Sequence, residues 1–78
     1  MSPTIFQYRN FRFFFFSREE PRMHVHVYTP NGEAKFWLTP KIELADNLGL
    51  KPADLKIALT QIHLHEAEIK AAWEKHFG

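Results

Sequence analysis

The chain has 78 residues, enough for one domain with one small core, because a chain of this length buries only about 60% of the surface that it exposes when unfolded. Its 10 Lys and Arg residues nearly balance its 9 Asp and Glu residues, so the net charge of +1 creates no overall field that would attract a nucleic acid or an anionic membrane. The absence of cysteine excludes a disulfide framework, a thiol nucleophile and a thiolate metal site, and it fits a reducing, cytoplasmic location.

The first predicted element is a strand over residues 8–16, where almost every residue is aromatic or arginine. Its apolar run is far shorter than the roughly 20 residues of a membrane helix, so we expect no membrane partner. Alternation along the strand gives two sets of side chains: Phe11, Phe13 and Phe15 on one face, and Arg12, Phe14 and Phe16 on the other. Because one helix covers only one face of a sheet, Phe14 and Phe16 need another cover, which could be a partner protein, a second copy of the chain or the N-terminal segment Ile5-Phe6. We expect them to form an interaction surface for a partner or for a second copy.

The next two predicted strands, residues 23–28 and 33–39, are joined by a turn at residues 29–32, which contains Pro and Gly. A four-residue loop pairs Val25 with Phe36 and keeps the apolar side chains of both strands on one face. A three-residue loop would shift the pairing by one residue and mix the faces, so we reject it. The opposite face then carries polar and aromatic side chains: His24, His26, Tyr28, Lys35 and Trp37.

In the C-terminal half, the spacing of apolar residues changes after a connector whose own pattern is weak. Residues 40–51 are predicted as either a short strand or a loop with one turn of helix. From residue 52 the apolar residues fall three or four apart, and no Gly or Pro interrupts the chain up to residue 77, which predicts one long helix. The predicted fold is a single α+β domain over residues 1–78, with three or four antiparallel strands in chain order and the helix on one face: sheet 4–39, connector 40–51 and helix 52–77.

Separated motifs cover essentially the whole chain. In order, they are Ser2-Pro3-Thr4-Ile5, Phe11-Arg12-Phe13-Phe14-Phe15-Phe16-Ser17, His24-Val25-His26-Val27, Ala34-Lys35-Phe36-Trp37-Leu38 and a C-terminal Ala72-Trp73 followed by His76-Phe77-Gly78. This series resembles domain-of-unknown-function family 4160, small bacterial proteins of about this size. Where that family usually has two prolines before the first His, this chain has Arg22 and Met23.

The resemblance implies a partner more clearly than a reaction. Members of the family are often encoded beside a second small protein, of domain-of-unknown-function family 2442, in a layout similar to a toxin–antitoxin pair. The resemblance therefore implies a small partner protein from a neighbouring gene, and it assigns neither an activity nor a cofactor.

His24 and His26 are the most suggestive pair, because alternate residues of a strand direct both imidazoles to one side. Three interpretations stay open: structural residues that hydrogen-bond across the sheet, a metal-independent acid and base, or two weak candidates for metal ligands. A metal site would require a third ligand from another part of the chain. The candidates for that ligand are Glu33, His63, His65 and Glu66.

The N-terminal half is basic, since residues 1–42 hold six cationic and three acidic side chains, while residues 43–78 hold four and six. A basic, aromatic sheet face could stack bases and neutralise phosphates, whereas in the alternative the rings form the core and the charges are solvated. The candidate binding residues are Arg12, His24, His26, Tyr28, Lys35 and Trp37.

Together these patterns predict a small cytoplasmic interaction module, one component of a toxin–antitoxin-like pair. It would bind a small partner protein, RNA or DNA through the aromatic and histidine face, or form a homodimer. The alternative is an enzyme, a metal-independent ribonuclease in which His24 and His26 act as acid and base and Arg12 stabilises the charge of the phosphorane-like transition state. We expect no cofactor in either case.

Overall fold

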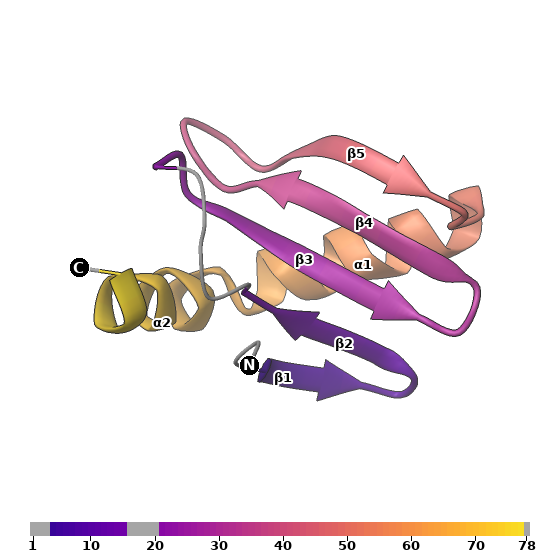
Figure 1. Ribbon diagram of the computed structural model, residues 1–78, viewed down its shortest axis with the longest axis horizontal. Coiled ribbons are helices and arrows are strands. Elements are labelled where there is room, and N and C mark those ends of the chain that lie inside the picture. Colours follow the sequence, from indigo (N-terminus) through magenta and orange to yellow (C-terminus); the bar gives the residue numbers. More distant parts are fainter. Residues whose placement is uncertain (1–3, 16–20, 78) are drawn as a thin grey trace.

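The computed structural model describes residues 4–15 and 21–77. In this part of the chain a five-stranded antiparallel sheet follows the chain order, and two helices lie across one of its faces (Figure 1). The elements are β1 (Thr4–Tyr8), β2 (Phe11–Phe14), β3 (His24–Thr29), β4 (Gly32–Trp37), β5 (Glu43–Leu48), α1 (Pro52–Leu64) and α2 (Glu66–Phe77). The α+β class and the antiparallel order are confirmed, but the predicted numbers of strands and helices are wrong.

The N-terminal aromatic segment contains a hairpin, which corrects the single strand predicted for residues 8–16. The chain reverses between Tyr8 and Phe11, and Arg9 takes a left-handed backbone conformation with φ of 55°. Positive φ is what a two-residue hairpin turn requires, and no Gly or Pro marks the position in the sequence. The added strand β1 places Phe6 beside Phe13 in the ladder.

The hairpin of β3 and β4 has the predicted register. Val25 pairs with Phe36 and His24 pairs with Trp37. The strands extend further than expected, because Thr29 pairs with Gly32 and the loop shrinks from four residues to two. Lengthening both strands by one residue at the turn leaves every other pair unchanged, which is why the register was predictable although the loop length was not.

The connector predicted for residues 40–51 contains a complete strand, β5, paired with β4. Five of its six residues are exposed, so the sequence shows no alternation of apolar and polar positions. A bulge at Ala45, between the pairs of Lys35 with Asp46 and Phe36 with Leu44, interrupts the pattern further. The sheet therefore has one more strand at this edge than residues 4–39 could supply.

The predicted single helix is interrupted at His65. This residue has φ of −109° and ψ of 17°, although its N–H still donates to the carbonyl of Gln61 at 3.0 Å. Its ring stacks on Phe6 of β1 with 4.0 Å between centroids, and its Nδ1 lies 2.9 Å from the Glu68 carboxylate. These contacts come from β1 and α2, so the spacing of apolar residues along the helix gives no sign of the break.

The core lies between the sheet and the helices. The predicted apolar face is confirmed, and the fully or nearly buried side chains include Phe11, Phe13, Phe15, Val25, Val27, Phe36 and Leu38 from the sheet side and Ala58, Ile62, Ile69 and Trp73 from the helices. Neither helix in the described part of the chain combines the length and the apolar character that crossing a bilayer requires. The helices leave the opposite face of the sheet uncovered by other elements in Figure 1, and we call it the open face.

A salt bridge on α2 gives a prediction about pH. The Lys70 ammonium donates a hydrogen bond to Glu66 at 2.7 Å, and this bond, together with the positive charge, lowers the pKa of Glu66 from its ordinary 4.5. The interaction therefore stabilises the fold above the ordinary pKa and is lost as the pH falls through the lowered one. We expect a carbon-detected NMR titration to give a pKa below 4.5 for Glu66 and Lys70→Gln to move it back upward. An unchanged pKa of Glu66 in that variant would show that Lys70 is not the cause of the lowered pKa.

Candidate functional site

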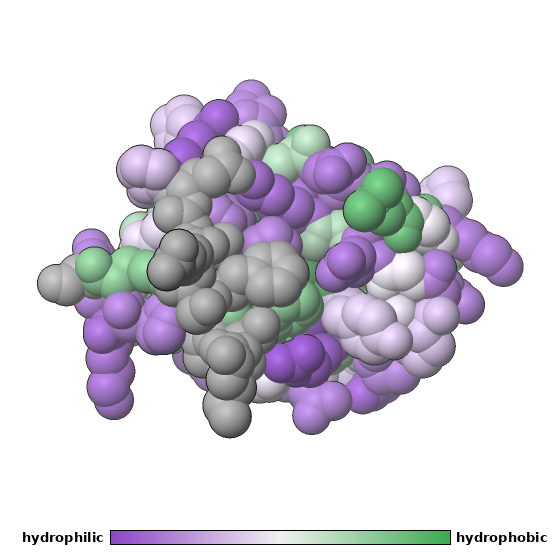
Figure 2. Space-filling view, in the orientation of Figure 1, coloured by the Kyte–Doolittle hydropathy of each residue, from purple (hydrophilic) through white to green (hydrophobic). Residues whose placement is uncertain are grey.

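The open face collects all the described candidate binding residues predicted from the sequence. Arg12 and Phe14 come from β2, and the register places Arg12 beside Tyr28 and Phe14 beside His26. The same face holds the following side chains from β3, β4 and β5: His24, His26, Tyr28, Glu33, Lys35, Trp37, Glu43, Asp46 and Leu48. Figure 2 shows this face as mostly hydrophilic, with small hydrophobic areas, one of them over β5.

Cations lie over the aromatic rings at both ends of the face. The Arg12 guanidinium lies 4.6 Å from the centre of the Phe14 ring, and its Nε donates to the Thr4 hydroxyl at 2.7 Å. At the other end, Lys35 and Arg22 lie 4.4 Å and 4.2 Å from the centre of the Trp37 ring. These cation–π contacts hold the rings in place and leave less aromatic surface open for stacking with a ligand.

Phe14 does not form an uncovered apolar surface, which corrects that expectation. Its side chain is only 4% exposed, since it lies under Arg12 and stacks on His26 with 5.5 Å between ring centres. Phe16, predicted to share this surface, lies outside the described residues. A partner that approaches the open face therefore meets Arg12 before it meets the Phe14 ring.

His24 is fully buried, at 0% exposure. Its Nδ1 lies 2.7 Å from the carbonyl of Arg22, and because a carbonyl can only accept, this nitrogen carries the proton. The ring also makes edge contacts with Trp37 and with Trp73 of α2, at 5.6 Å and 5.3 Å between centres. A side chain with no solvent contact cannot reach a substrate in this conformation, so the acid and base interpretation would require His26 to work without it.

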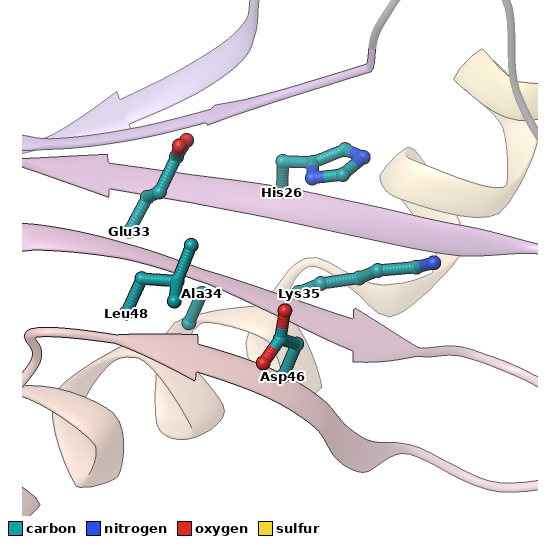
Figure 3. Close-up of a pocket in the computed structure, with 6 residues that line it drawn as sticks. All are labelled: His26, Glu33, Ala34, Lys35, Asp46 and Leu48. Carbon is teal, nitrogen blue, oxygen red and sulfur yellow. The ribbon is translucent and has the colours of Figure 1, made fainter.

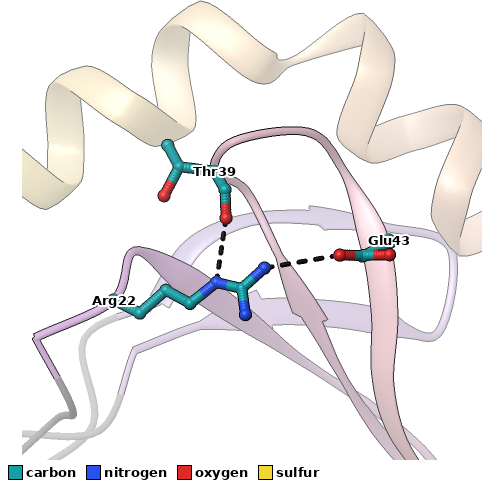
Figure 4. Close-up of polar contacts among 3 residues, drawn as sticks. All are labelled: Arg22, Thr39 and Glu43. Atoms are coloured by element: carbon teal, nitrogen blue, oxygen red, sulfur yellow. Dashed lines mark hydrogen bonds and ion pairs between the residues drawn. The ribbon is translucent and has the colours of Figure 1, made fainter.

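Arg22, which lies just before β3, connects the ends of β3, β4 and β5. Its Nε donates to the carbonyl of Thr39 at 2.9 Å, and its Nη2 lies 3.3 Å from the Glu43 carboxylate (Figure 4). Both partners of this ion pair are nearly half exposed, so the pair itself contributes little to stability. Its effect is to hold the guanidinium over the Trp37 ring, 4.2 Å from the ring centre.

A shallow depression of about 150 Å³ lies on the open face between β3, β4 and β5. Its lining, drawn in Figure 3, consists of His26, Glu33, Ala34, Lys35, Asp46 and Leu48. The sequence did not mark Asp46 and Leu48 as site residues, because residues 40–51 were predicted only as either a short strand or a loop and were assigned to no face of the sheet. A basic and two acidic side chains thus meet around one small hollow, and Leu48 beside them is 63% exposed.

Charges on the described open face balance. Three cationic side chains, Arg12, Arg22 and Lys35, face three carboxylates from β4 and β5, those of Glu33, Glu43 and Asp46. The excess of positive charge predicted from residues 1–42 is therefore offset on this face by the acidic edge strand. A surface of balanced charge offers little attraction to a phosphate backbone.

Metal binding finds no support beyond the histidine pair. Within residues 4–15 and 21–77, no group of three or more His, Asp or Glu side chains could hold a metal ion together. His24 and His26, whose rings lie 5.1 Å apart, thus lack a third ligand among the described residues.

Comparison with known proteins gives one match. The family model described as "Domain of unknown function (DUF4160)" matches residues 10–74, a span that runs from the turn before β2 into α2. No curated protein and no solved structure matches the chain. Because the family match covers most of the sequence, including the open face from β2 to β5, the chain belongs to the DUF4160 family.

Proposed function

We propose that this chain is a small cytoplasmic interaction module that binds a partner protein through the open face, as one component of a toxin–antitoxin-like pair. One observation carries the proposal: Tyr28 and Leu48, 49% and 63% exposed, share this face with side chains of both charges, and Leu48 lines the depression together with Glu33, Lys35 and Asp46. An exposed aromatic ring and an exposed leucine among polar groups are the composition from which protein interfaces are built.

The charge balance favours a protein over a nucleic acid. Glu33, Glu43 and Asp46 would repel phosphates that Arg12 and Lys35 attract, and nucleic-acid binding depends on a net positive surface. The rings that could stack on bases are covered by cations at Phe14 and Trp37. A protein partner can instead match both charges, each with its opposite.

Leu48→Lys should weaken binding to the partner while leaving the fold intact, because a lysine on the open face removes apolar contact area and adds a charge. We expect an affinity at least about tenfold weaker in isothermal titration with the small partner protein that the proposed pair implies. The matched control is Leu64→Lys, since Leu64 is 72% exposed but belongs to α1 on the other side of the sheet.

The outcomes separate the classes of partner. Wild-type affinity in both variants would contradict docking on the open face. If no heat is released with the protein but a single-stranded RNA binds with a strong salt dependence, the proposal of a protein partner is wrong. Cleavage of that RNA, lost in His26→Ala, would support the ribonuclease alternative instead.

A further inference from the structure

The strand β5 forms one edge of the described sheet, with β4 as its sole neighbour there. Alternate backbone N–H and C=O groups of an edge strand point away from the sheet, where they can pair with a further strand. Five of the six residues of β5 are exposed, and Leu44 and Leu48 are 46% and 63% exposed. No described element covers this edge.

The composition of β5 determines which strand could pair with it. Natural edge strands are often protected by charged side chains, above all lysine, by proline or by bulges. The strand β5 contains neither lysine nor proline, but it has a bulge at Ala45 and two acidic side chains, Glu43, which is paired with Arg22, and Asp46. The Asn47 N–H donates to the Asp46 carboxylate at 2.9 Å, so the carboxylate lies against the backbone of the strand. This contact holds the negative charge of Asp46 beside the edge strand, and it occupies the Asn47 N–H, which is therefore not available to an added strand.

The opposite edge differs in this respect. The strand β1, Thr4–Tyr8, has no charged side chain, so electrostatics cannot select a partner there. A second copy of the chain is also a poor match for β5, because antiparallel pairing of two β5 strands brings carboxylates of the same sign together. A strand with basic side chains is the occupant that complements β5.

We propose that β5 accepts an added strand from the partner protein, edge to edge, and that this strand alternates basic and apolar residues. The basic side chains would face Glu43 and Asp46 on the open face, and the apolar ones would cover Leu44 on the other face of the sheet. The inference rests on the proposed function and specifies the part of the partner that docks.

Two synthetic peptides of equal length with blocked ends test the edge without the partner: one alternates lysine and valine, the other glutamate and valine. With the ¹⁵N-labelled chain, we expect the basic peptide to shift the amide signals of β5 and slow their hydrogen exchange, and the acidic peptide to bind at least about tenfold more weakly. Asp46→Asn, which keeps an oxygen acceptor for the Asn47 N–H, should reduce this preference, and Asp46→Lys should reverse it.

The control is Glu74→Lys, which changes the net charge as much as Asp46→Lys but at an exposed position of α2. It should leave the preference unchanged. Equal binding of both peptides, protection at β1 instead of β5, or no effect on β5 would overturn the inference. If the basic peptide occupies β5 while the neighbouring protein does not bind the chain, the edge inference stands and the proposed function fails.

Discussion

Phe13→Ala should lower the free energy of unfolding by about 3–5 kcal/mol, which is a large part of the stability of a domain this small. Phe13 is fully buried and stacks on Phe6 with 4.3 Å between ring centres, and Phe6 in turn stacks on His65 at the helix break. The smaller side chain would leave a cavity under this column of three rings, which joins β1, β2 and the helices. Urea titration followed by circular dichroism measures the loss.

The same titration on Leu64→Ala is the control, because this leucine is 72% exposed and its removal should cost less than about 0.5 kcal/mol. If Phe13→Ala were as stable as the control, the ring would not lie in the core, and the two-layer packing described above would be wrong.

Gly32→Ala should be the most disruptive change outside the core, with an expected loss of about 2–4 kcal/mol. Gly32 has φ of 155°, and a Cβ there would collide with the carbonyl oxygen of Leu48 and lie 2.9 Å from the Cα of Gly49. Both obstacles are backbone, so they can yield only if β5 moves away from β4. The variant should therefore lose the amide protection of β5 as well as stability.

Asn31→Ala, one residue earlier in the same turn, is the matched control, since Asn31 is exposed and has a negative φ. It should stay within about 0.5 kcal/mol of the wild type. Wild-type stability and wild-type amide protection in Gly32→Ala would show that β5 does not lie against this turn. The carboxylates of β5 would then not lie at the edge of the open face.

Strong local patterns made part of this fold predictable. The alternation of Val25 and Val27 with the histidines, and the single register that keeps Phe36 opposite Val25, gave the β3–β4 hairpin and its core face. The predictions that failed concern features that depend on contacts between residues distant in sequence. The turn at Arg9 is formed without Gly or Pro, and the break at His65 involves stacking on Phe6.

The site was predictable to the same extent. Period two placed Arg12, His26, Tyr28, Lys35 and Trp37 on one face, as the structure has them. Exposure was not predictable, because it depends on neighbouring side chains: a cation covers Phe14, and two tryptophans enclose His24. Two of the three carboxylates on the face belong to β5, whose sequence gives only a weak strand pattern, and so the balance of charge is found only in three dimensions.

The most direct test of partner binding through the open face is affinity purification of the tagged chain from its own host at normal expression, with mass spectrometry and nucleic-acid quantification of the eluate. We predict one small protein in stoichiometric amount, retained by wild type and Leu64→Lys and lost from Leu48→Lys. An eluate that holds RNA instead of a protein, or a partner that Leu48→Lys retains in full, would contradict the account.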